Sequence, residues 1–192
     1  NILMEMIRPQ VKKDTIFIVD ESDIEKPYAK KMEGIQMVHN GSKSMRTNGY
    51  LLLNIFALLP HQDGYNLLPA SSILFAPDME LDSAKQVLQD KIIDQQVAFR
   101  NKGIYVFDRG YDDRKLIGFL RDNGVSFVIR GMGTRAVKEG LVETNFKKVV
   151  DDMDFKYQFA GFKPGETFRC ATRRIAVRTD DHPSKKSNSV EV

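Results

Sequence analysis

The first two-thirds of the chain alternate between short apolar runs and polar segments. Thr15–Val19 and Ile104–Phe107 are rich in β-branched and aromatic residues, and they are followed directly by Asp20 and Asp108. A third run, Val125–Ile129, is followed by an arginine. Short, continuous apolar runs of this kind predict strands that are buried on both faces of a sheet.

Longer segments of two kinds accompany these runs. Tyr50–Leu59 and residues 66–77 are extended, largely apolar stretches, and we predict that they form strands. Residues 83–100 and 112–123 carry apolar side chains at helical intervals, and the first of these segments opens with the Ser-x-x-Gln spacing of a capping box. Both are therefore predicted to be helices, the first of which begins at its serine.

The predicted order is three strands, a helix, a strand, a helix and a strand, which is typical of an α/β protein with a mixed sheet. It is also the order of the RNase H-like fold, in which the first three strands form an antiparallel meander. Beyond this region the pattern changes to short strand-like segments separated by glycine or proline, near residues 147–150, 156–162 and 167–177.

We therefore predict two parts. Residues 1–131 would form an RNase H-like core, a mixed sheet flanked by helices. Residues 132–192 would form the start of a β-rich insertion subdomain, incomplete, with a polar tail whose last residues, SKKSNSVEV, are expected to be structureless.

Composition narrows the class of protein only slightly. The 192 residues carry a net charge of +3, which permits nucleic-acid binding without requiring it. The single cysteine, Cys170, excludes an internal disulfide, and no cysteine–histidine spacing indicates a zinc site. The longest apolar stretch, Leu51–Pro60, is far shorter than the roughly 20 residues of a membrane helix. An intracellular protein is expected, and the first residue, which is not methionine, favours a piece of a longer polypeptide.

The two aspartates that follow the apolar runs are the candidates for chemistry. Side chains at the carboxyl ends of neighbouring parallel strands converge, so Asp20 and Asp108 would meet if their strands are neighbours. Two close carboxylates repel each other unless a cation lies between them, and Mg²⁺ (or Mn²⁺) prefers such oxygen ligands. Two ions roughly 4 Å apart would support phosphodiester cleavage. Alternatively, each aspartate caps a turn. Asp23 is expected to face away from Asp20.

Two blocks of sequence around these aspartates resemble a known family. VDESDIEKPYAKKMEGIQMVHNGSKSMRTNGYLL is similar to the first-aspartate block of IS4-type DDE transposases, in which a strand ends in an aspartate and a lysine-rich hairpin and a Gly-Tyr strand follow. YVFDRGYDDRKLIGFLRDNGVSFVIRG is similar to the second block, a strand ending in Asp-Arg-Gly, a helix, and a strand ending in arginine. The resemblance covers residues 15–131. It implies that Asp20 and Asp108 are the first two acidic metal ligands and catalytic residues.

The resemblance also implies a DNA partner. Arg130 would bind a DNA phosphate, although an ordinary ion pair is the alternative, and Arg109 lies beside the proposed site. The basic residues of the hairpin would contact the DNA backbone, or else form a solvated surface; they are Lys26, Lys30, Lys31, Lys43 and Arg46. Transposon ends and target would be double-stranded DNA, and the full-length protein would act as a homodimer in the bacterial cytoplasm, at the nucleoid.

One element of the family's pattern is missing. DDE transposases use a third acidic residue, a glutamate in a Tyr-Arg-Glu-Lys helix after the insertion, and no segment matches it; Glu191 is a poor substitute. The fragment alone is therefore expected to be inactive, whereas the full-length protein would hydrolyse phosphodiesters and transfer strands. The alternatives are an RNase H-like nuclease that cleaves without joining, and an inactive remnant that binds DNA or supports assembly.

Overall fold

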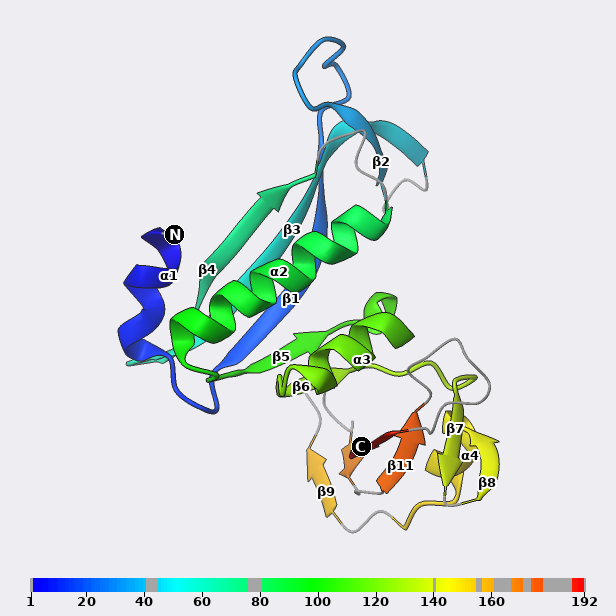
Figure 1. Cartoon of the computed structure of the whole chain (residues 1–192). Coiled ribbons are helices and arrows are strands. Elements are labelled where there is room, and N and C mark those ends of the chain that lie inside the picture. The colour runs from blue at the N-terminus through cyan, green and yellow to red at the C-terminus, as the bar shows by residue number, and fades with distance from the viewer. Residues whose placement is uncertain are drawn as a thin grey trace.

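The computed structural model describes most of the chain (Figure 1). The described residues are 2–40, 45–75, 81–139, 141–154, 157–160, 167–170, 174–177 and 188–191.

A six-stranded sheet forms the centre of the molecule, in the order β2-β3-β1-β5-β6, with β4 also paired to β3. Strand β3 is antiparallel to β1, β2 and β4, whereas β5 and β6 run parallel to β1. The predicted meander is confirmed as β1, β3 and β4; β2 is an additional strand that was not predicted. The strands are β1 (Ile16–Glu25), β2 (Gln36–Asn40), β3 (Met45–His61), β4 (Gly64–Leu74), β5 (Ile104–Phe107) and β6 (Phe127–Ile129).

Two helices, α2 (Leu81–Phe99) and α3 (Arg114–Asp122), pack on one face of this sheet (Figure 1). Phe17 on β1, Ile92 on α2 and Leu120 on α3 are each 0% exposed and belong to one apolar core. A short helix, α1 (Ile2–Ile7), and a 3₁₀ turn, η1 (Arg8–Gln10), precede β1, and α1 lies beside β4. The α/β class and the RNase H-like mixed sheet are therefore confirmed.

The described residues cover the opposite face of the sheet less completely. Ile16 and Ile18 of β1 are only half-buried there, whereas the alternating Phe17 and Val19 are buried against the helices. Val128 of β6 is 56% exposed. We call this the open face of the sheet, since α2 and α3 both lie on the other side.

Strand β1 is longer than the predicted Thr15–Val19 and does not end at Asp20. It pairs with β3 along its whole length, from Ile16 opposite Leu58 to Glu25 opposite Gly49. Pairing to β5, in contrast, ends at Val19. The second half of β1 therefore lies at an edge, where polar residues remain in contact with solvent and the apolar pattern stops.

Helix α2 begins earlier than predicted. It starts at Leu81, so Ser83 lies inside the helix and cannot be its N-cap. Helix α3 begins at Arg114, and its N-cap is Asp113, whose carboxylate accepts a hydrogen bond from the Leu116 amide at 3.1 Å. The Lys85 ammonium on α2 donates to the same carboxylate at 3.3 Å and connects the two helices.

This cap predicts a pH-dependent contribution to stability. Partial burial raises the pKa of Asp113, but hydrogen bonds from the Leu116 amide and from Lys85 outweigh it, so that the pKa lies below its ordinary value of 3.8. A carboxyl group with a lowered folded-state pKa stabilises the fold above its unfolded pKa, and this contribution is lost as the pH falls through the folded value.

We expect Asp113→Ala to cost about 1 kcal/mol at pH 7, the usual loss for an N-cap aspartate. The difference from wild type should shrink as the pH falls below 3.8. Urea unfolding of both proteins across this pH range measures it. A loss that stays constant with pH would show that the charge of the cap does not stabilise α3.

The C-terminal part contains two small sheets. One is four-stranded, in the order β12-β11-β7-β8, and the other pairs β9 with β10. An apolar cluster of Ile117 on α3, Val137 on β7 and Val149 on α4 joins this part to the core. The boundary at residue 131 stays a prediction. The elements are β7 (Ala136–Glu139), β8 (Val142–Asn145), α4 (Phe146–Asp151), β9 (Tyr157–Ala160), β10 (Thr167–Cys170), β11 (Arg174–Val177) and β12 (Asn188–Glu191).

Two expectations for this part are wrong. The predicted strand at 147–150 is helix α4, because Asn145 caps it by accepting from the Lys148 amide at 2.9 Å and Val149 turns inward, 5% exposed. The tail is not structureless, because Asn188–Glu191 pairs with β11 through backbone hydrogen bonds that need no apolar periodicity. No helix among the described residues is long and apolar enough to span a membrane.

Candidate active site

The strand register brings three of the predicted site residues into one row. Pairing of β1 with β5 ends at Val19 opposite Phe107, and β5 pairs with β6 up to the same level. The next residues on the three adjacent chains are Asp20, Asp108 and Arg130. Asp20 is therefore a neighbour of Asp108 although it is not at the end of its own strand, because the strand that ends here is β5.

The two aspartates belong to the open face. Side chains alternate along a strand, so Asp20 lies on the same face as Ile18. In the same way, Asp108 lies on the face of Val106. Together with Arg130 these residues line a cavity of about 410 Å³ on that face. Asp20 and Asp108 are both exposed, so a cation and a nucleic-acid backbone can reach them from solvent.

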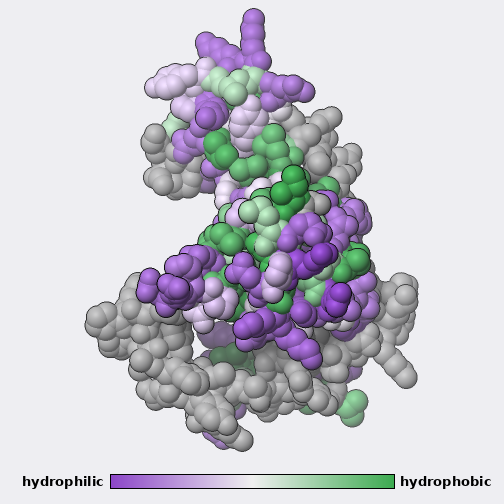
Figure 2. Space-filling view, turned by 90° about the vertical axis from the view of Figure 1, so that its left-hand side faces the viewer, coloured by the Kyte–Doolittle hydropathy of each residue, from purple (hydrophilic) through white to green (hydrophobic). Residues whose placement is uncertain are grey.

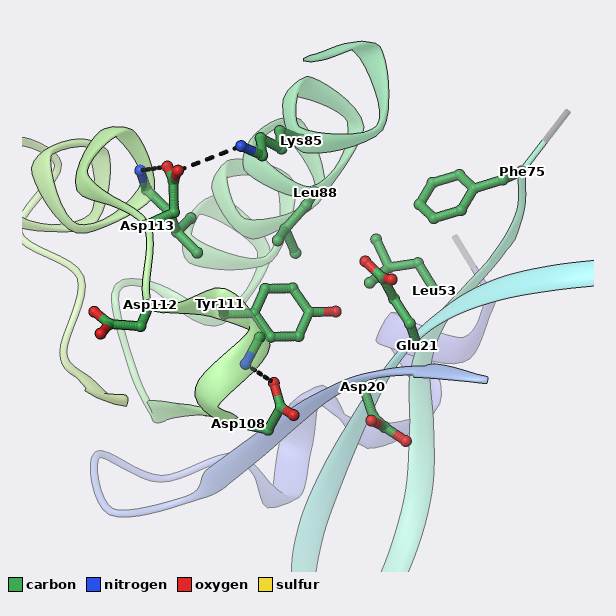
Figure 3. Close-up of a pocket in the computed structure, with 12 residues that line it drawn as sticks. Asp20, Glu21, Leu53, Phe75, Lys85, Leu88, Asp108, Tyr111, Asp112 and Asp113 are labelled. Atoms are coloured by element: carbon green, nitrogen blue, oxygen red, sulfur yellow. Dashed lines mark hydrogen bonds and ion pairs between the residues drawn. The ribbon is translucent and has the colours of Figure 1, made fainter. Parts of the chain in front are cut away.

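A turn after β5 fixes the Asp108 carboxylate. Asp108 caps the 3₁₀ turn η2 (Arg109–Tyr111), and its Oδ1 accepts a hydrogen bond from the Gly110 amide at 2.7 Å (Figure 3). Within the described part of the chain, its Oδ2 receives no hydrogen bond. The turn-capping role considered as an alternative is thus present, and it leaves one oxygen available for a metal ion.

Glu21 lies on the other side of β1 from Asp20 (Figure 3). It faces a second cavity, of about 450 Å³, on the helix side of the sheet, where Tyr111 points toward it; Asp20 and Asp108 also line this cavity. Burial raises the pKa of Glu21; the Tyr111 hydroxyl opposes this shift, and the negative charges of Asp108, Asp20 and Asp23 add to it.

The Tyr111 hydroxyl completes this helix-side pocket. It is buried and points toward the Glu21 carboxylate, close enough to influence the pKa of that group, but outside the geometry of an ordinary hydrogen bond. Burial, followed by the charge of Glu21, raises its pKa, so Tyr111 stays protonated at neutral pH. The sequence interpretation missed both residues, although alternation along β1 would have placed Glu21 on the buried side with Val19.

Asp20 and Asp108 have the chemistry of ligands for a divalent ion. Among the residues that the structure describes, no group of three or more carboxylate, imidazole or thiolate side chains is arranged to hold a metal. Mg²⁺ retains several waters and is commonly held by one or two carboxylates together with substrate phosphates. Asp20 and Asp108 supply that number of carboxylates.

The predicted DNA-binding residues fall into two groups. Arg130 lines the cavity beside the aspartates and makes no ion pair with a described residue, and Arg109 is exposed in the η2 turn. The other residues occupy the hairpin at the far end of β1: Lys26, Lys30, Lys31 and Arg46 are exposed there, and Lys43 lies outside the described residues.

The hairpin is separated from the aspartates. Lys26 follows Asp20 by six residues of mostly extended chain, roughly 20 Å at about 3.3 Å per residue. Hydrophilic side chains dominate this tip of the molecule in Figure 2. The structure thus places Arg130 and Arg109 beside the two aspartates. The basic hairpin lies about 20 Å away from them, which corresponds to about six base pairs of duplex at roughly 3.4 Å each.

Comparison with known families identifies the class of protein. The family described as Transposase DDE domain matches residues 11–158, a span that contains both aspartates and continues into the C-terminal part. The chain belongs to this family and is a DDE transposase catalytic domain. No curated protein matches it.

Membership of this family settles the general activity. The chain belongs to a class of nucleases and transposases that act on DNA in transposition and recombination, and DDE transposase domains generally use divalent metal ions. The IS4-type subgroup stays a prediction.

Proposed function

We propose that Asp20 and Asp108 hold the catalytic Mg²⁺ or Mn²⁺ of a transposase that hydrolyses phosphodiester bonds and then transfers the freed strand. The observation that carries the proposal is the register of β1 and β5, which makes these two residues neighbours on the open face. Arg130, in the next position of the same row, supplies the positive charge that a phosphate needs.

Each residue of the row has a task in this reaction. Asp20 and Asp108 would hold the ions, and the Gly110 amide keeps the Asp108 carboxylate in a fixed orientation. When two divalent ions are bound, they supply an activated water and stabilise the leaving oxygen. Arg130 would orient the scissile phosphate through two parallel hydrogen bonds. The same arrangement serves strand transfer, with the 3′-hydroxyl of the cleaved strand as the attacking group in place of water.

Among the described residues, Asp20 and Asp108 belong to no group of three or more side chains that could hold a metal. The family's triad includes a third acidic residue; we propose that it approaches the pair from the open face, and we expect Asp20 and Asp108 without it not to catalyse the reaction. Proteins of this kind act on chromosomal DNA, and the bacterial cytoplasm, at the nucleoid, is the proposed place of action.

The basic hairpin extends the proposed DNA path. Lys26, Lys30 and Lys31 are exposed and would contact the phosphate backbone of double-stranded transposon ends or target, without reading sequence. Arg46 belongs to the same proposed surface, and the same role is proposed for Lys43, which lies outside the described residues, from the sequence alone. We also propose that the protein acts as a homodimer in the complex that brings the two transposon ends together. This part of the proposal is supported by membership of the family alone.

Mn²⁺ titration calorimetry tests the metal site directly. We expect the wild-type chain to bind Mn²⁺, and Asp20→Asn and Asp108→Asn each to weaken binding by more than the roughly 10–100-fold that supporting residues of a metal site contribute. Asp23→Asn is the matched control, because Asp23 lies three residues further along β1 and points to the other face. It should bind as the wild type does.

Two results would overturn the proposal. One is a wild-type chain that binds no Mn²⁺, which would favour an inactive DNA-binding remnant. The other is an equal affinity in wild type, Asp20→Asn and Asp108→Asn, which would place the ion elsewhere.

A further inference from the structure

The polar row of the active site continues across the sheet beyond Asp20. The residue opposite Asp20 on β3 is Asn54, and the residue opposite Asn54 on β4 is Ser72. Directly opposed residues of antiparallel strands project from the same face, with Cβ atoms about 5 Å apart. Ser72, Asn54 and Asp20 therefore form one line on the open face, which Asp108 extends.

Asn54 is a polar residue within the apolar stretch of β3 from Leu51 to Leu59. The residues of β3 on the same face before and after it are Leu52, Phe56 and Leu58. Asn54 is nevertheless buried, 7% exposed. A buried amide is costly unless its polar atoms are bonded, so an asparagine is not the residue that packing alone would favour here.

Ser72 determines how the Asn54 amide is turned. The Ser72 hydroxyl donates to Asn54 Oδ1 at 2.8 Å, which directs the amide oxygen toward β4. Its NH₂ group carries two donors and no acceptor, and it is turned away from β4. Among the described residues, the bond from Ser72 is the one hydrogen bond of the Asn54 side chain. The NH₂ group therefore has donors to offer on the side of β1.

We propose that Asn54, oriented by Ser72, is a positioning residue that donates a hydrogen bond to the Asp20 carboxylate and holds it in the metal-ligating orientation. This inference rests on the proposed function, since it assigns a partner to a proposed ligand. Carboxylate ligands of metal sites are themselves hydrogen-bonded, which fixes the oxygen that faces the ion. Gly110 donates such a bond to Asp108, and by this inference Asn54 donates the corresponding bond to Asp20 when the ion is bound.

Mn²⁺ titration of Asn54→Leu and Ser72→Ala tests the inference. Leucine suits the apolar surroundings of Asn54 and removes its donors, so the sheet should fold while Mn²⁺ binding weakens about tenfold, the lower end for a residue that orients a ligand. Ser72→Ala removes only the group that turns the amide and should weaken binding by less. Ser72 is exposed, so this variant leaves folding unaffected.

Ser71→Ala is the matched control. Ser71 is the adjacent serine of β4, opposite Ile55, and lies on the helix side of the sheet. The Ser71 side chain is 4% exposed, so removing its hydroxyl tests whether a small cavity beside β4 is enough to weaken metal binding. Ser71→Ala should bind Mn²⁺ with the wild-type affinity.

The outcomes separate this inference from the proposed function. If Asp20→Asn loses Mn²⁺ while Asn54→Leu and Ser72→Ala bind it as the wild type does, Asn54 does not position Asp20 and the inference is overturned alone. If Asp20→Asn itself binds normally, the metal site is overturned. If Asn54→Leu does not fold, a reduced affinity of Ser72→Ala relative to Ser71→Ala still supports the inference, and equal affinities still refute it.

Discussion

Replacement of Arg135 by alanine is expected to destabilise the chain by about 3–5 kcal/mol, the usual loss when one partner of a buried ion pair is removed. The guanidinium of Arg135 contacts the Asp112 carboxylate at 2.5 Å, and the two side chains are only 9% and 1% exposed. Asp112 also accepts from the Met132 amide at 2.7 Å. Without Arg135, a carboxylate would remain buried with one donor.

Arg8→Ala is the matched control for this effect. Arg8 pairs with Glu5 at 3.1 Å, but both side chains are more than half exposed. A surface pair of this kind contributes about 0–1 kcal/mol. Urea unfolding at neutral pH measures both losses. If Arg135→Ala lost no more than Arg8→Ala, the buried pair would not stabilise the fold.

A double variant separates the pair from its surroundings. In Asp112→Leu/Arg135→Met neither charge is left buried alone, so the combined loss should be smaller than the sum of the two single losses. Asp112 directly follows the η2 turn, and Arg135 precedes β7, so the pair connects this turn to the C-terminal part.

The second large effect is expected for Gly103→Ala. Gly103 has a φ of 99°, which side-chain-bearing residues rarely adopt, and an added Cβ would lie 2.2 Å from Cε2 of Phe17. Phe17 cannot easily move, because it is 0% exposed and stacks between Phe99 and Tyr105 with ring centroids 5.3 and 5.1 Å away. Backbone strain of about 1–2 kcal/mol and overpacking of about 1–3 kcal/mol should add.

Gly124→Ala controls for the backbone strain. Gly124 also has a positive φ, of 65°, but an added Cβ would meet nothing within 4 Å. It should cost about 1–2 kcal/mol, the strain alone. Thermal or urea unfolding gives both values, and Phe17→Leu in the Gly103→Ala background should recover part of the loss. Equal losses for the two alanine variants would show that the Phe17 ring yields without cost.

Apolar runs predicted the centre of the fold well. The run Ile104–Phe107 is β5 without a change of boundary, because the apolar residues begin and end with the strand, although only Tyr105 and Phe107 are fully buried. The same logic failed for β1, whose residues after Val19 are polar and yet extended. These residues are extended because their backbone pairs with β3, and the polarity of their side chains does not show that this pairing occurs.

The proposed site was predictable in part for the same reason. Strand-end positions suggested that Asp20 and Asp108 meet, and the register of β1 and β5 places them as neighbours. Alternation along β1 was enough to place Glu21, but Asn54 could not be assigned, because its position depends on which residue of β3 lies opposite Asp20. The pair of Asp112 with Arg135 was also invisible, because it depends on the path of the chain after β6.

The overhang of β1 beyond β5 has a consequence for local unfolding. Up to Val19, β1 lies between two strands, so this half separates only when the sheet as a whole opens. From Asp20 onward, β3 is its one pairing partner among the described strands, so this half can open together with the β2–β3 hairpin, at a lower free energy. Asp20 thus lies at the junction between a rigid and a more labile half of one strand, where motion of the hairpin can reach the carboxylate without disturbing the core.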